Sequence, residues 1–202
     1  MREWLKREKR RLVAGLIFLA VSLGLFFCVN LDWSSPPVRV AKGYMKAAIG
    51  NDYMALYRLF DPSVLEGEMA RNGLDRAGLE RVAQTNADRV KRHIADVEST
   101  YAVKARFAYA VTGVEALTPE QLEQLTLAYD ADGLSIDLQD GRQVTVRATA
   151  TLTGAAGRAA LERDLVLTVL QTPRGWSLDR DSMYAYWDLL YALPNFAWDN
   201  FS

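Results

Sequence analysis

An uncharged run of twenty residues, Leu12 to Leu31, constrains this 202-residue chain more than any other feature. At the rise of an α-helix the run would measure about 30 Å, the thickness of a bilayer's hydrocarbon core. Six basic and two acidic side chains precede it, and Asp32 follows it. The positive-inside rule therefore predicts a single-pass helix over 12–31 in the cell membrane, in contact with lipid. Residues 1–11 would form a cytoplasmic basic tip, and the rest would be extracytoplasmic.

Two other readings of this run fit the residues less well. A cleaved signal peptide has a shorter apolar core and a cleavage site flanked by small residues, and Cys28-Val29-Asn30 is a poor site of that kind. A lipoprotein signal would need a small residue just before Cys28, where this chain has Phe27. We therefore expect an anchor that is retained.

Composition excludes several classes of function for the part beyond the anchor. Residues 32–202 hold 18 basic and 23 acidic side chains, an acidic balance that disfavours nucleic-acid binding. One cysteine and one histidine exclude a disulfide framework, a multi-cysteine zinc site and any metal site that needs two imidazoles. We predict no metal and no cofactor.

Helical spacing dominates the first half of the outer segment. Residues 32–37 (DWSSPP) read as a short linker to a domain over 38–181. Apolar residues from Val38 to Phe60 follow a helical period, which is interrupted at 50–52 and ended by Asp61-Pro62. Over 74–99 an apolar stripe from Leu79 to Val97 opposes a charged face, which predicts a helix laid against a sheet.

The period then changes to two, which is typical of strands. Residues 101–112 alternate as a half-buried strand, and Thr118-Pro119 predicts the start of a short helix. Further strands are expected over 134–138, with a hairpin at Asp140-Gly141, and over 144–153, 161–169 and 176–178. Helices followed by antiparallel strands predict an α+β fold with helices on one face of a curved sheet.

This order of elements resembles the nuclear transport factor 2-like (cystatin-like) superfamily, in its small membrane-anchored bacterial extracytoplasmic form. The resemblance covers about residues 38–180. It rests on a bent first helix with the pattern Gly50-Asn51-Asp52 before Leu56, and on a last strand pair that reads Gly175-Trp176-Ser177-Leu178. It implies a cone-like domain in which helices fill a curved antiparallel sheet, and it allows self-association through the sheet. Because the fold hosts enzymes, binding modules and scaffolds, it does not settle the function.

The sequence presents no catalytic constellation. His93 is the only histidine, and its neighbours Arg89, Lys91 and Arg92 place it on a basic solvated edge rather than in a general-base role. The pairs Asp130/Asp132 and Asp179/Asp181 lack the further ligands of a calcium loop and read as solvated turns. Aromatic residues that could line an apolar pocket, or simply form core, are Tyr57, Tyr101, Phe107, Tyr109 and Trp176.

The C-terminal segment, 182–202, is the least ordinary part of the chain. Residues 184–202 contain seven of the chain's 21 aromatic residues: Tyr184, Tyr186, Trp187, Tyr191, Phe196, Trp198 and Phe201. One reading is a closing helix over 182–193 followed by an irregular tail. The other is an exposed aromatic surface that meets a partner protein or the bilayer.

These observations favour a non-enzymatic, membrane-tethered extracytoplasmic module that binds or scaffolds other envelope proteins, such as components of a secretion assembly. The alternative is a domain that binds a small apolar ligand inside the cone, with an isomerase-like enzyme as its extreme form. A filled cone beside a conspicuous aromatic surface would favour the first reading. An open cavity that faces a buried carboxylate would favour the second.

Overall fold

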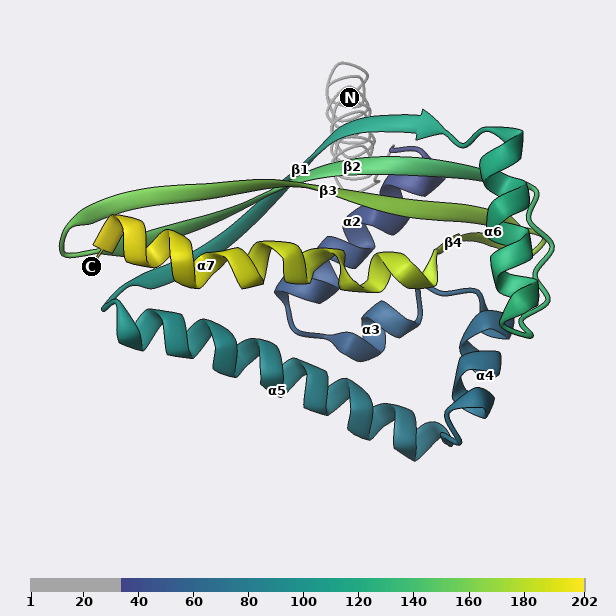
Figure 1. Cartoon of the computed structure of the whole chain (residues 1–202), viewed down its shortest axis with the longest axis horizontal. Helices are drawn as coiled ribbons and strands as arrows, with labels where there is room; N and C mark the ends of the chain where they lie inside the picture. Colours follow the sequence, from purple (N-terminus) through teal and green to yellow (C-terminus); the bar gives the residue numbers. More distant parts are fainter. Residues whose placement is uncertain (1–33, 202) are drawn as a thin grey trace, which may run out of the picture. The chain divides into compact units, whose positions relative to one another are not determined.

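The computed structural model describes residues 34–201, which form an α+β fold (Figure 1). The predicted membrane helix over 12–31 lies outside the described residues. Within 34–201, no helix is long and apolar enough to cross a membrane. In chain order the elements are α2 (Pro36–Ile49), α3 (Tyr53–Tyr57), α4 (Pro62–Arg71), α5 (Arg76–Thr100), β1 (Lys104–Ala116), α6 (Pro119–Ala131), β2 (Asp140–Gly154), β3 (Gly157–Thr172), β4 (Gly175–Leu178), the 3₁₀-helix η1 (Arg180–Tyr184) and α7 (Ala185–Phe201).

The four strands form one antiparallel sheet in the order β1-β2-β3-β4. Helices α2, α5 and α7 contact one face of this sheet. Among the described residues the other face is exposed over most of its length and is covered beside α6, where Leu170 is buried. The inner face carries side chains from alternate positions of β2 and β3, including Val146 opposite Leu165 and Val144 opposite Leu167, all buried. The predicted alternation, and the fold class it implied, are confirmed.

The N-terminal helices are interrupted at 50–52 and again at Asp61-Pro62, as the sequence predicted. Helix α2 already begins at Pro36, inside the stretch expected to be a linker, because proline is well suited to the first helical turn. Asn51 adopts a left-handed backbone conformation (φ 57°) that ends this helix, and Asp52 caps the first turn of α3. Asp61 caps α4, accepting hydrogen bonds from the backbone N–H and the hydroxyl of Ser63.

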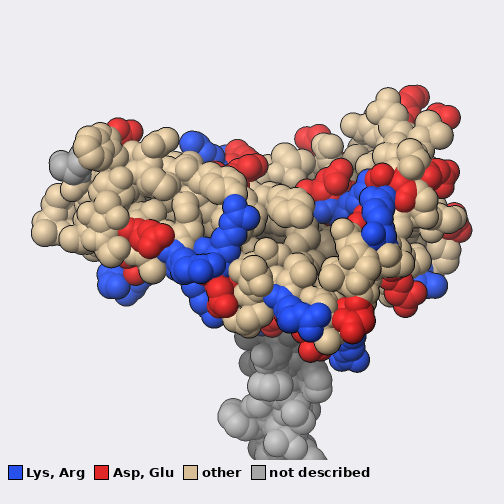
Figure 2. All heavy atoms as spheres, turned by 60° about the horizontal axis from the view of Figure 1, so that its bottom comes forward, with Lys and Arg blue, Asp and Glu red and all other residues tan. Residues whose placement is uncertain are grey.

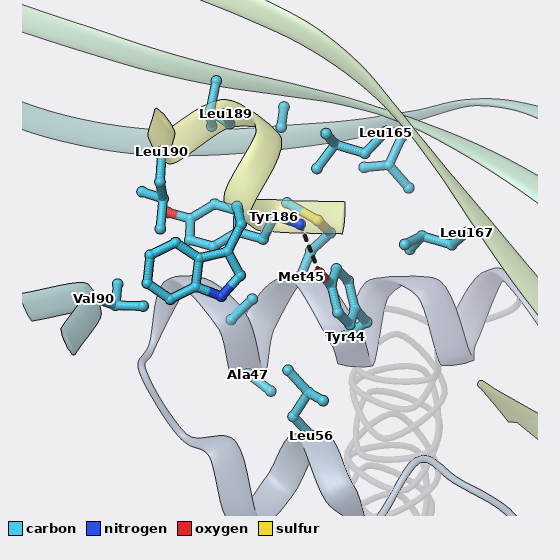
Figure 3. Close-up of a cluster of buried hydrophobic side chains, with 14 of the residues drawn as sticks. Tyr44, Met45, Ala47, Leu56, Val90, Leu165, Leu167, Tyr186, Leu189 and Leu190 are labelled. Carbon is cyan, nitrogen blue, oxygen red and sulfur yellow. Dashed lines mark hydrogen bonds between the residues drawn. The ribbon is translucent and has the colours of Figure 1, made fainter. Parts of the chain in front are cut away.

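Helices α2 and α7 fill the space in front of the sheet (Figure 3). Tyr44 is fully buried, and its hydroxyl accepts the backbone N–H of Tyr186 at 2.8 Å and donates to the Met183 carbonyl at 3.1 Å. One phenol therefore joins α2 to the point where η1 becomes α7. Burial raises the pKa of Tyr44, so the hydroxyl keeps its proton and its role as a donor.

A second, smaller apolar cluster lies beside α6 at one end of the sheet. The capping box of Thr118 and Gln121 starts α6 as predicted. Residues 134–138 do not form the expected strand, and Asp140-Gly141 is not a hairpin but the start of β2. Their alternation has another cause, because Leu134 and Ile136 bury their side chains in this cluster beside Tyr129. Alternation alone does not distinguish a strand from an extended segment packed on a helix.

Helix α7 continues through Pro194 to Phe201, seventeen residues in all, so the predicted end at residue 193 is wrong. Proline has no N–H for the carbonyl four residues earlier, which here belongs to Leu190. The Nε2 atom of His93 lies 2.7 Å from that carbonyl oxygen and donates the missing hydrogen bond. The sole histidine is thus half-buried between α5 and α7 and is not on a solvated edge, which corrects the sequence-based interpretation.

Candidate binding cleft

A cleft of about 770 Å³ opens where α5 diverges from α4 and η1. Its lining comes from α3, α4, α5, η1 and the end of α6, and most of it is apolar. The apolar lining residues are Tyr57, Phe60, Val64, Leu65, Met69, Leu74, Leu79, Val82 and Met183. Several of them, such as Leu65 and Met69, are only half-buried and therefore accessible to a ligand. The volume lies within the range of sites that hold small ligands or side chains of a partner.

A closed ring of four charged side chains forms one end of the cleft. Arg180 pairs with Glu68 at 3.0 Å and with Asp132, and Arg71 pairs with the same two carboxylates at 3.7 and 3.2 Å. These residues belong to η1, α4 and the end of α6, so the ring fastens three elements that are distant in sequence. Within the ring each charge has two opposite neighbours. Arg180 also lies 3.7 Å from the carboxylate of Asp181, whose side chain is 86% exposed, so the group of five carries one excess negative charge.

Two buried side chains, Asp179 and Tyr129, lie next to Arg180 of this ring. Asp179 is 4% exposed and accepts a hydrogen bond of 2.8 Å from the hydroxyl of Tyr129, whose ring lies 5.0 Å from the guanidinium carbon of Arg180. Burial raises the pKa of Asp179, partly offset by that hydrogen bond. The carboxyl does not line the cleft, so the pair acts as a support and not as an acid or base for a ligand.

The five aromatic residues considered as pocket candidates do not meet in one place. Only Tyr57 lines the cleft, where its hydroxyl accepts a 3.4 Å hydrogen bond from Asn86. Phe107 packs edge-to-face on Tyr186 in the main core, with ring centroids 5.9 Å apart. Three others are spread around the fold: Tyr101 ends α5, Tyr109 donates to the Lys42 carbonyl, and Trp176 lies under Arg142.

The aromatic residues of the C-terminal segment divide between inside and outside. Tyr186 and Trp187 are buried, and Phe196 and Phe201 are half-buried against the core. The exposed members are Tyr184, Tyr191 and Trp198, with 55–63% of each residue accessible. Tyr184 also lines the cleft and directly precedes α7 in the chain.

Tyr191 is held in place although it is exposed. Its ring lies 5.3 Å from that of Trp187 and 6.1 Å from that of His93, and its hydroxyl accepts a 3.3 Å hydrogen bond from Arg89. The guanidinium of Arg89 also lies over the Trp187 ring at 5.0 Å. A ring fixed by its neighbours loses little conformational entropy when a ligand covers it.

Sequence reasoning missed most of the cleft because it missed helix α4. Asp61-Pro62 was read only as the end of a helix, although a capping aspartate followed by proline is also a strong signal for the start of one. Val64, Leu65 and Met69 lie at helical spacing after it and supply one wall. The ion ring carried no sequence signal, since its members lie up to 112 residues apart.

Comparison with models of known protein families gives no match for this chain, and comparison with curated proteins gives none either.

Proposed function

We propose that this chain is a non-enzymatic binding module that is tethered to the cell membrane by residues 12–31 and docks another envelope protein on its extracytoplasmic side. In this proposal the domain is a member of the nuclear transport factor 2-like superfamily, and the cleft with the adjoining rings of Tyr184 and Tyr191 is the docking surface.

The observation that carries the proposal is where apolar surface is buried and where it is accessible. Helices α2 and α7 fill the concave side of the sheet with side chains such as Tyr44 and Leu189, neither of which is accessible. Accessible apolar side chains also line the cleft, next to fixed aromatic rings and a charged rim, whereas the exposed Leu127, Val166 and Trp198 lie outside its lining. An apolar centre with aromatic anchors and a polar rim is typical of protein-binding sites.

The charge pattern also supports a protein partner. On the face shown in Figure 2, basic and acidic side chains are interspersed, so both signs of charge are available to a partner. A mixed-charge rim favours partners with a matching arrangement of charges over a polyanion.

A photo-crosslinking amino acid at Leu65 in the full-length chain would test the proposal in native membranes. We expect one defined envelope protein to be crosslinked at this cleft position. The same label at Val166, which is 50% exposed on the opposite face of the sheet, serves as the control. The substitution Met69→Lys, which places a charge in the cleft, should abolish the crosslink. Equal labelling from Val166, or no crosslinked protein at all, would contradict the proposal.

A small apolar ligand is the second candidate, and the volume of the cleft favours it. In that case the label at Leu65 would capture a small molecule and no protein. The ligand would lie in the surface cleft and not inside the sheet, where the earlier expectation placed it.

A further inference from the structure

Strand β1 is an edge strand with an unpaired side. It is first in the sheet order and pairs with β2 alone, so its other side faces no strand among the described residues (Figure 1). It is thirteen residues long and contains no proline. Such an edge presents backbone groups that can pair with another strand, and proteins ordinarily protect it.

One hydrogen bond shows which backbone groups point outward. The N–H of Ala105 donates to the carboxylate of Glu98 on α5 at 2.8 Å, so it does not bond to β2. Successive residues of a strand direct their backbone groups to opposite sides. The N–H and C=O groups of Phe107, Tyr109 and Val111 therefore point away from β2 as well, and none has a hydrogen-bond partner within residues 34–201.

We propose that these groups pair with the same groups of a second copy of this chain, so that two β1 strands run antiparallel across a two-fold axis near Tyr109. Phe107 then lies opposite Val111 of the partner subunit, and the two sheets become one continuous sheet. This pairing does not depend on the proposed function, because the cleft is formed by α3, α4, α5, η1 and the end of α6.

Charge and side-chain size favour a second copy as the occupant. Arg106 lies near the beginning of β1 and Glu115 lies near its end, beyond the paired segment, while Lys104 is already paired with Glu98 of its own chain at 3.1 Å. Antiparallel self-pairing therefore brings Arg106 of each strand toward the end of the other strand that carries Glu115. Between these ends, the exposed positions of the outer face are the small residues Ala108 and Ala110, which leave room for a neighbouring strand.

The structure itself limits the pairing to the first part of β1. Glu98 caps the outward N–H of Ala105, and the register of β1 against β2 shifts between Val111 and Gly113. A bulge of this kind bends a strand and ends regular pairing. The open edge between these two features offers three outward residues on each copy, which is enough for a short antiparallel ladder.

Disulfide formation between differently tagged full-length chains would test the register. One chain carries Ala108→Cys and the other Ala110→Cys, both with Cys28→Ser to remove the natural thiol. The proposed axis makes these positions a directly opposed, non-hydrogen-bonded pair with Cα atoms about 4.5 Å apart, which a disulfide can bridge. We expect mixed disulfide dimers under mild oxidation and little crosslinking when either variant is oxidised alone.

Charged substitutions at Ala108 and Ala110 test the affinity of the two copies for each other. Dimerisation is measured by energy transfer between labelled full-length chains in detergent micelles. The double variant Ala108→Lys/Ala110→Lys opposes like charges across the axis and should weaken dimerisation by about tenfold. The variant Ala108→Lys/Ala110→Glu carries the same first substitution but opposes unlike charges, and it should restore the dimer. All these side chains lie on the exposed face, so the fold is preserved.

Three results would overturn the pairing. The first is the absence of the mixed disulfide, and the second is equal dimerisation of the two charge variants. The third is a disulfide yield from Ala160→Cys, on the outer face of β3, that equals the yield from the β1 positions. The last result would mean that the copies pack face to face and not edge to edge.

Discussion

Two junctions hold the elements of this domain together, and they differ in the kinds of side chain that form them. Between the sheet and helices α2 and α7 the contact is apolar, with Leu165, Leu167 and Leu189 almost wholly buried. At the meeting of α4, α6 and η1 a ring of ion pairs around Arg180 lies beside an apolar cluster that includes Val64 and Tyr129. The side chains of the apolar junction have almost no accessible surface, whereas the ion pairs around Arg180 form one end of an open cleft.

The difference follows from the physical nature of the two contacts. Apolar attraction has no direction, so side chains pack until water is excluded. Charged groups must keep their hydrogen-bond geometry and part of their hydration, so they are rarely buried completely. An ionic junction can therefore fasten elements while it leaves space and solvent beside it, which is what a binding surface requires.

The largest expected effect comes from the apolar junction. Leu167→Ala removes a fully buried side chain opposite Val144 and should lower the free energy of unfolding by about 2–5 kcal/mol. The neighbouring Val166→Ala on the outer face is the control and should cost less than about 0.5 kcal/mol. Chemical denaturation of both variants measures the contrast, and equal losses would contradict the assigned faces of β3.

A smaller effect is expected at the ionic junction. Arg180→Ala leaves Glu68 and Asp132 with Arg71 alone and should cost roughly 2 kcal/mol, because Arg180 is the better shielded member of the ring. Arg147→Ala, which breaks an exposed pair with Asp164, should cost clearly less. Denaturation in high salt tests the origin of the loss, since salt should reduce the Arg180 effect if it is electrostatic.

The smallest effect is expected at a single polar contact between α5 and α7. His93→Ala leaves the Leu190 carbonyl without a donor and should cost about 1 kcal/mol. In a Pro194→Ala background the helix regains a backbone N–H for that carbonyl, so the same change should cost measurably less. A double-mutant cycle measures this coupling, and strictly additive effects would show that His93 does not serve the carbonyl that Pro194 leaves unpaired.

Local patterns predicted elements better than they predicted boundaries. The stripe from Leu79 to Val97, the alternation around Val146 and the cap at Thr118 each depend on near neighbours in the chain, and each matches the structure. The predicted end of the closing helix at residue 193 was wrong because the carbonyl that Pro194 leaves unpaired is compensated by a histidine 101 residues earlier in the chain.

The sequence by itself determined the α+β class, the inner and outer faces of the strands and the position of the uncharged N-terminal run, because hydrophobic periodicity and capping act over a few residues. Only the tertiary structure decided which aromatic rings are buried and which remain accessible, and where the cleft opens. It also decided that Glu68, Asp132 and Arg180 meet. Those outcomes depend on contacts between segments far apart in the chain, and no local pattern specifies the distance or angle at which such segments pack.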